Sequence, residues 1–92
     1  MTFALNQNYP NPFNPTTNIE FAIPQHVTVR LEVYDILGRL VTTLANSDMP
    51  AGTYKVTWNG KDSNGMSVAS GLYLYRLQAG SFTSVKKMLM LK

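Results

Sequence analysis

Regular alternation of apolar and other residues is the feature that most constrains the fold of this chain. It is clearest at residues 27–34, where Val27, Val29, Leu31 and Val33 alternate with Thr, Arg, Glu and Tyr. Successive side chains of a β-strand point to opposite faces of its sheet, so this pattern predicts a strand with one buried face. No window of the sequence shows the helical period of about 3.6 residues.

Turn residues divide the remaining chain into further short strands. The Asn-Gly pairs at 59–60 and 64–65 favour tight turns, and Gly38 can take the positive φ angle that a hairpin requires. About seven short strands with turns every 8–12 residues are typical of an antiparallel, immunoglobulin-like β-sandwich. We therefore predict this all-β fold, with a small barrel as the alternative. The predicted strands cover residues 19–23, 27–34, 40–44, 54–58, 71–77 and 82–91, with a short extended piece at 67–69.

The alternation also predicts which side chains face the core. The inward sets, besides the valines and leucine above, are Ile19, Phe21 and Ile23; Tyr54, Val56 and Trp58; Tyr73, Tyr75 and Leu77; and Val85, Leu89 and Leu91. Lys87 shares the face of the last set, so we expect a β-bulge or a register shift beside it. Tyr34 is expected to point outward, and the five acidic residues are expected on solvated faces or in loops.

The first segment of the chain is set apart by its prolines, three of them within six residues. Proline lacks the N–H that a helix or a central strand needs, and the residue before it is pushed to an extended conformation. We therefore predict that residues 1–17 form a stiff, extended lead-in to a sandwich of residues 18–92, the whole chain being one domain. The aromatic residues of the lead-in, Tyr9 and Phe13, are expected to pack onto the domain edge.

The composition argues against catalytic and metal-binding chemistry. A chain of 92 residues buries about 60% of its unfolded surface, which leaves one modest core. There is no cysteine, and His26 is the only histidine, so neither a thiolate zinc site nor a histidine triad can be built. No serine lies in a Gly-x-Ser-x-Gly elbow, and residues 59–65 do not fit the ligand spacing of a calcium loop. We therefore expect no enzyme activity, no cofactor and no metal.

Charge is unevenly spread along the chain. Residues 1–52 carry two basic and four acidic side chains, whereas residues 53–92 carry six basic and one acidic. The basic residues are too widely spaced to predict nucleic-acid binding, and no apolar run approaches the ~18 residues of a membrane helix, so direct membrane insertion is not expected. The first residues lack the basic and apolar regions of a signal peptide, so the chain either stays inside the cell or is a piece of a longer exported protein.

Five sequence blocks follow one another along the chain from about Leu5 to its last residue. They are Asn8–Thr17, Val33–Val41, Ala51–Gly60, Val68–Leu77 and Lys86–Lys92. Together they resemble the C-terminal sorting domains of the type IX (Por) secretion system, which occurs in the Bacteroidetes and allied Gram-negative bacteria. The positions that carry the resemblance most specifically are Pro10, Asn11, Pro12, Phe13, Asn14, Pro15, Gly38, Arg39, Gly52, Gly71 and Tyr73.

The resemblance implies that the chain acts as an address for a larger protein. A parent protein, N-terminal in the same chain, would enter the periplasm by its own signal peptide. The outer-membrane translocon would then recognise the folded C-terminal domain, and a sortase-like protease would cleave it. The parent would end attached to the cell surface or released from the cell.

The last strand is the candidate recognition element, because a terminal strand can pair with the sheet of a partner through its main chain. Methionine tolerates varied packing partners, and lysines steer a strand to an acidic surface. In a purely structural reading, the strand is the last rung of the sandwich and its lysines protect the edge. The candidate recognition residues are Lys86, Lys87, Met88, Leu89, Met90, Leu91 and Lys92.

A second resemblance defines the alternative function. The immunoglobulin-like domain of flagellar hook-cap proteins shares the Pro-Asn-Pro-Phe and Tyr-Asp-x-x-Gly-Arg elements found at residues 10–13 and 34–39. It implies a structural spacer, or a sugar-binding module, of a larger extracellular or hook-cap protein. The Lys-Lys-Met ending at 86–88 favours the sorting domain over this alternative.

Overall fold

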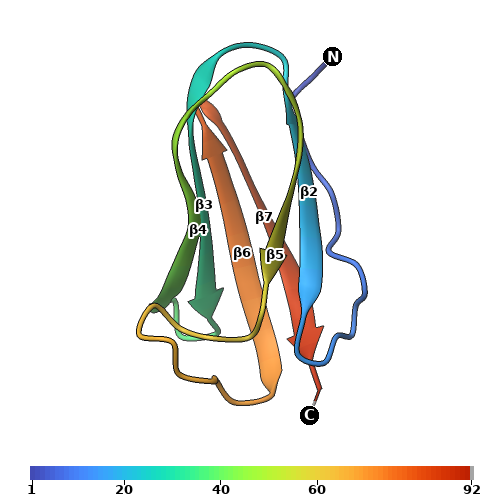
Figure 1. The fold of residues 1–92 in the computed structure, drawn as a ribbon, viewed down its shortest axis with the longest axis vertical. Helices are drawn as coiled ribbons and strands as arrows, with labels where there is room; N and C mark the ends of the chain where they lie inside the picture. The colour runs from blue at the N-terminus through green and yellow to red at the C-terminus, as the bar shows by residue number, and fades with distance from the viewer. Residues whose placement is uncertain (92) are drawn as a thin grey trace.

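Two antiparallel β-sheets packed face to face make up the computed structural model, which describes residues 1–91 (Figure 1). One sheet has three strands in the order β1-β2-β5, and the other has four in the order β4-β3-β6-β7. The predicted all-β, immunoglobulin-like sandwich of about seven strands is confirmed. The described residues contain no helix that is long and apolar enough to cross a membrane. The strands are β1 (Ala4–Leu5), β2 (Thr17–Ile23), β3 (Val27–Asp35), β4 (Leu40–Met49), β5 (Gly52–Trp58), β6 (Gly71–Ala79) and β7 (Phe82–Met90).

The lead-in runs beside β2 and loops under the end of the sandwich before β2 begins (Figure 1). It contains β1, in which Ala4 and Leu5 pair with Ala22 and Phe21. Three of its peptide bonds, those preceding its prolines, are cis. Because of the pairing of β1 with β2, the lead-in belongs to the three-stranded sheet from Ala4 onward.

The strand predicted at 40–44 continues to Met49, because β4 pairs with β3 along its whole length. Its second half carries Asn46, Ser47 and Asp48, which show no alternation, so the sequence pattern indicated only the first half. The register of β3 and β4 shifts at two places. These two register shifts lie between β3 and β4, whereas the β-bulge or register shift that we expected beside Lys87 would lie on β7, at the opposite edge of the sheet.

The core lies between the two sheets, and four predicted inward sets point into it. Trp58, the last residue of β5, packs against two other aromatic rings, with the ring centroid of Phe13 at 5.7 Å and that of Tyr73 at 5.3 Å. Residues of this size contribute most of the apolar area that a small domain can bury. The buried apolar residues are Leu5, Phe13, Ile19, Phe21, Ile23, Val29, Leu31, Val33, Trp58, Tyr73, Tyr75, Leu77, Ala79, Met88 and Met90.

The predicted inward set of the last strand is wrong. Strand β7 pairs with β6 in one continuous register from Phe82 to Met90, without a bulge. Met88 and Met90 are buried, whereas Val85 and Leu91 are about half exposed. Both parities of this strand carry apolar residues, so the alternation alone could not choose between them. The observed parity leaves Lys87 in solvent, which removes the cost of burying its charge.

Two further expectations are corrected. Tyr9 does not pack onto the domain, because its side chain is 79% exposed. Its backbone pairs with Asn18, and residues directly opposite each other in an antiparallel pair project to the same face, here the solvent face of β2. Glu32 was expected in solvent but is buried, because the side chains of Tyr34 and Arg76 cover it on the outer face of the four-stranded sheet.

Candidate recognition surface

The outer edge of β7 is the first element of the candidate site. Strand β7 is the last strand of its sheet, so half of its backbone groups face away from β6. Leu89 identifies this half, because its N–H donates to Asn11 Oδ1 and its carbonyl accepts from the N–H of Phe13, both at 3.0 Å. Backbone direction alternates along an antiparallel strand. The odd-numbered residues of β7 therefore present their N–H and C=O groups outward.

The lead-in covers the C-terminal half of this edge. Besides the two bonds at Leu89, the N–H of Leu91 donates to the carbonyl of Phe13 at 2.8 Å. Gln7 Nε2 donates to the carbonyl of Lys87 at 2.7 Å. The lead-in thus acts as a short added strand, with Phe13 bridged in parallel to Met90. From the carbonyl of Lys87 onward, this part of the edge is occupied by the chain itself.

No strand of the described chain is hydrogen-bonded to the N-terminal half of the edge, although β1 of the other sheet passes close to β7. Within residues 1–91, no hydrogen bond engages the outward N–H and C=O groups of Thr83 and Val85, or the N–H of Lys87. We call residues 83–87 the open edge segment. Just upstream of it, the stacked rings of Phe3 and Phe82, 5.2 Å apart, close the end of the sandwich. An unpaired run of this kind is a template for a further strand.

The part of the lead-in that bonds to β7 runs from Gln7 to Phe13, and we call it the covering segment. Phe13 anchors it. Its side chain is only 2% exposed and packs against Trp58. Gly60 permits this close approach, because a Cβ there would lie 3.1 Å from the carbonyl oxygen of Pro15 and 3.3 Å from Met90 Cε. Its φ angle of +75° also favours glycine. Gly60 thus has a steric role beyond the turn that the sequence indicated.

A buried polar network fixes the start of the covering segment. Asn8 Nδ2 donates to Thr17 Oγ1 at 2.9 Å and to the carbonyl of Pro10 at 3.1 Å. The hydroxyl of Tyr75 accepts from the N–H of Asn8 at 2.8 Å and donates to the carbonyl of Asn6 at 2.7 Å. Burial raises the pKa of Tyr75 to about 12, and the bond from Asn8 opposes the shift. No pattern in the sequence indicates that Asn8 and Thr17 are anchors, because their bond joins residues that the fold brings together.

The inward residues of the predicted recognition block belong to the interior. Met88 is 1% exposed and Met90 is fully buried, both under the covering segment and the opposite sheet. Lys86 lies on the same face and is half-buried, as expected for a lysine whose stem lies against apolar surface at an open edge. In the folded domain the two methionines are therefore out of reach of a partner.

The outward residues of the block are the ones that a partner can reach. Lys87 is exposed, Leu89 is half-buried and Leu91 is about half exposed. Lys92 lies outside the described residues. The structure thus divides the block into a core face and an outer face. The reachable part consists of Lys87, the two leucines and the backbone of the open edge segment.

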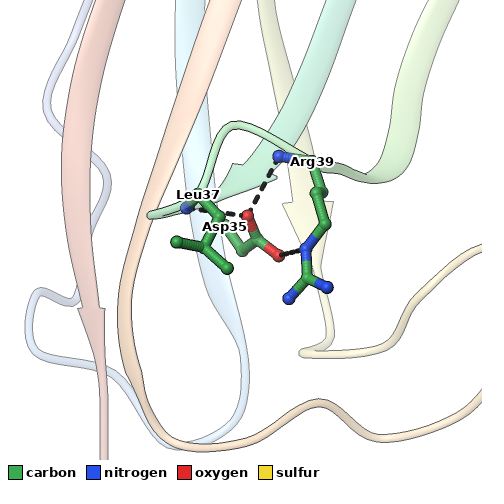
Figure 2. Close-up of polar contacts among 3 residues, drawn as sticks. All are labelled: Asp35, Leu37 and Arg39. Carbon is green, nitrogen blue, oxygen red and sulfur yellow. Dashed lines mark hydrogen bonds and ion pairs between the residues drawn. The ribbon is translucent and has the colours of Figure 1, made fainter.

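The turn after β3 explains two of the motif positions, Gly38 and Arg39, and Figure 2 shows the contacts that Asp35 makes in it with Leu37 and Arg39. Asp35 Oδ1 accepts from the backbone N–H of Leu37 at 2.9 Å and of Arg39 at 3.0 Å, and Asp35 Oδ2 pairs with Arg39 Nε at 2.8 Å. Gly38 takes a φ angle of +82° between them. The bond from the Arg39 N–H is the main reason that the pKa of Asp35 lies below its usual value. This motif closes a hairpin.

The remaining motif positions are structural as well. Tyr73 is buried, and its hydroxyl donates to the carbonyl of Ala69 at 2.6 Å. Gly71 and Gly52 begin β6 and β5. Around the buried Phe13, the other members of the Pro-rich block are exposed; they are Pro10, Asn11, Pro12, Asn14 and Pro15.

Strands β3 and β6 place an ion pair in the middle of the four-stranded sheet's outer face. Glu32 Oε1 accepts from the hydroxyl of Tyr34 at 2.7 Å and pairs with an Arg76 guanidinium nitrogen at 3.0 Å. Arg76 also lies over the Tyr34 ring, 5.3 Å from its centroid. Burial alone would raise the pKa of Glu32, but these two partners outweigh it and lower that pKa. The three groups bond to one another and hold β3 to β6, although Arg76 Nε is buried without a hydrogen-bond partner within residues 1–91.

Comparison with known proteins places this sandwich in a family. Residues 7–82 match the FlgD Ig-like domain family, which is more than half of the chain. The chain belongs to this family. Its structure is similar to FlgD from P. aeruginosa, with a TM-score of 0.62 and 28% identity over 80% of this chain and 59% of that one. No protein of curated function matches the chain.

Two proteins from Porphyromonas gingivalis share the fold of this FlgD Ig-like domain. The dimeric latent form of PorU matches with a TM-score of 0.76 and 21% identity, over 99% of this chain. PorZ, an essential bacterial surface component of the type IX secretion system, matches with a TM-score of 0.62 and 22% identity, over 98% of this chain. The chain spans only 10% of the PorU chain and 11% of the PorZ chain. These similarities concern one domain of much larger proteins.

Proposed function

We propose that this FlgD Ig-like domain is a sorting domain that directs a parent protein across the outer membrane by the type IX secretion system. The observation that carries the proposal is the open edge segment of β7, whose outward backbone groups have no hydrogen-bond partner within residues 1–91 and which ends at the exposed Lys87. The fold shared with PorU and PorZ supports it, because PorZ is a component of that system. The five sequence blocks described above support it independently.

The proposed partner is the outer-membrane translocon, which would add an extended segment to residues 83–87. Main-chain hydrogen bonds to Thr83, Val85 and Lys87 would supply affinity, and a basic side chain at the end of the segment would favour an acidic partner. The covering lead-in limits this contact to the N-terminal half of the edge. The domain itself would perform no catalysis and bind no cofactor.

The parent protein would be fused before residue 1, and a sortase-like protease would cleave on the N-terminal side of the sandwich. The lead-in is held by Phe13 and the Asn8 network, so cleavage inside residues 8–17 would require partial unfolding. Residues 1–3 take no part in this network, although Phe3 stacks on Phe82. We therefore place cleavage upstream of β1, after which the parent would remain at the cell surface or be released.

A second function, an immunoglobulin-like spacer of a larger extracellular or hook-cap protein, is favoured by one observation. The family match covers residues 7–82 and so ends at the first residue of β7. A spacer needs the sandwich but has no need of an open edge. The two functions therefore differ in whether changes confined to residues 83–87 matter.

The test is export of a fluorescent reporter fused before residue 1, with a signal peptide, in a host that has a type IX system. Truncating β7 is unsuitable because it removes the buried Met88 and Met90. Val85→Pro removes an outward N–H and fixes φ at about −65°, a change that an edge strand can accommodate. Lys87→Glu reverses the exposed charge, and Lys61→Glu makes the same change at an exposed site in the connection after β5.

We expect Val85→Pro and Lys87→Glu to leave the reporter in the periplasm, and Lys61→Glu to export like the original domain. All variants must show the original thermal unfolding midpoint within a few degrees. Normal export of both edge variants would remove the open edge segment from the mechanism and favour the spacer function.

A further inference from the structure

The outer face of the three-stranded sheet carries a polar row that the proposed sorting function does not use. On β2, Ile19 and Phe21 point into the core, so Asn18 and Glu20 point to solvent. The register places Glu20 opposite Lys55 of β5. Residues opposite each other in an antiparallel pair share a face. Strands β2 and β5, together with the lead-in that bridges to Asn18, therefore contribute polar side chains to one surface.

Tyr9 projects beside this row. Its side chain is 79% exposed, yet its backbone is held by two hydrogen bonds with Asn18, each 2.9 Å long. The ring is thus presented on a fixed backbone instead of a mobile loop. Together these groups surround an open depression of about 200 Å³, lined by Asn6, Gln7, Tyr9, Asn18, Glu20 and Lys55.

The polar groups of the depression keep hydrogen-bonding capacity for a ligand. Glu20 and Lys55 form no ion pair with each other, since the two ion pairs within residues 1–91 are those of Arg39 and Arg76. Asn18 accepts a bond from Thr57 through Oδ1, at 2.7 Å, which leaves its amide N–H groups to donate. A carboxylate, an ammonium group and a carboxamide therefore line the same depression as the Tyr9 side chain.

We propose that this depression binds a single ring of a neutral saccharide. One face of a sugar ring presents C–H groups, which can pack on the Tyr9 ring, and its edge presents hydroxyls that both donate and accept. Glu20 accepts from a hydroxyl, and Lys55 and Asn18 donate to its neighbours. The one acid and the one base of the lining cancel, which favours a neutral ligand over a charged one. The volume is below the ~300 Å³ typical of pockets for larger ligands, which limits it to one ring.

This site is independent of the sorting proposal. It lies on the β1-β2-β5 sheet, whereas the open edge segment belongs to the other sheet. A carrier of this domain would gain a weak contact with glycans at a cell surface or in the medium. Either function can hold without the other, and the tests do not share a variant.

The test is an NMR titration of the 92-residue chain with neutral oligosaccharides. The panel contains gluco-, manno-, galacto-, xylo- and N-acetylglucosamine oligomers, each up to about 20 mM, a range that covers weak single-ring binding. We expect at least one to shift the backbone signals of residues 6–9, 18–20 and 55. Tyr9→Ala should weaken that binding by about tenfold, while Tyr9→Phe, which keeps the ring, should retain most of it.

Two further variants separate binding from general effects. Glu20→Gln removes the charge of the acceptor and should weaken binding several-fold, whereas Lys61→Ala, at an exposed residue that does not line the depression, should change nothing. The exposed position of Tyr9 means that Tyr9→Ala should keep the signals of the core unchanged. No shift with any sugar of the panel, or binding that survives Tyr9→Ala unchanged, would overturn the proposal.

Discussion

Replacing Phe13 with alanine tests whether the lead-in is part of the folded domain. The side chain is 2% exposed and packs on Trp58, in a site that also holds Met90 against Gly60. Removing a buried phenylalanine from a core costs about 3–5 kcal/mol. The lead-in can relax into part of the cavity, so we expect a loss of about 3 kcal/mol in the free energy of unfolding.

The assay is urea unfolding followed by the fluorescence of Trp58, the only tryptophan. Tyr9→Ala is the matched control, because it removes a ring of similar size from the same segment at an exposed position. It should cost less than about 0.5 kcal/mol. A loss below about 1 kcal/mol for Phe13→Ala, against typical domain stabilities of 5–15 kcal/mol, would refute the conclusion that Phe13 anchors the lead-in.

Hydrogen exchange on the same variant tests the covering of the strand edge. The N–H groups of Leu89 and Leu91 are bonded only to the lead-in, through Asn11 and Phe13. If the side chain of Phe13 holds the segment down, Phe13→Ala should speed exchange at these two sites. Exchange at Val33, in the middle of the sheet, should change only as much as global stability does. Equal acceleration at all three sites would contradict a local anchor.

Three further changes probe the turns and the polar network. Gly60→Ala should lower the thermal midpoint more than Gly65→Ala, because both positions have a positive φ angle but only Gly60 has neighbours that a Cβ would meet, and equal effects would contradict the steric role. Asp35→Asn should destabilise the domain at pH 7 in urea unfolding. Because the folded pKa of Asp35 is lowered, this difference should shrink as the pH falls below about 4, and a constant difference would refute it. The pKa of Tyr75 is raised to about 12, so its stabilisation should be complete below pH 10 and disappear by pH 12, a loss of about 2–3 kcal/mol that Tyr75→Phe should lack.

The sequence was informative wherever a strand has one face in the core and the other in solvent. Strands β2, β3 and β6 meet this condition, and their inward residues follow directly from the alternation. Strand β7 does not meet it, because both of its sides carry apolar residues. Met88 and Met90 point to one side, and Val85, Leu89 and Leu91 point to the other. The orientation of β7 is decided by the neighbouring strand, in which Tyr73 and Tyr75 already face inward.

The candidate site could be predicted only in part, because it depends on pairings between distant residues. The pattern indicated that the last strand is terminal and basic, but the Asn11–Leu89 bond joins residues 78 positions apart. No periodicity in the Pro-rich segment distinguishes the buried Phe13 from the exposed Tyr9. Phe13 is buried because its backbone bridges to Met90, and Tyr9 is exposed because its backbone bridges to Asn18. The depression beside Tyr9 could not be predicted from the sequence either, because its lining residues come from segments that are distant in the chain.

The central claim is that the domain acts as a type IX sorting domain, and one measurement tests it most directly. A reporter with a signal peptide and residues 1–92 at its C-terminus is expressed in a host with an intact type IX translocon and in the same host without it. The account predicts reporter at the surface or in the medium of the intact host and in the periplasm of the other. A folded fusion protein with the same location in both hosts would contradict it.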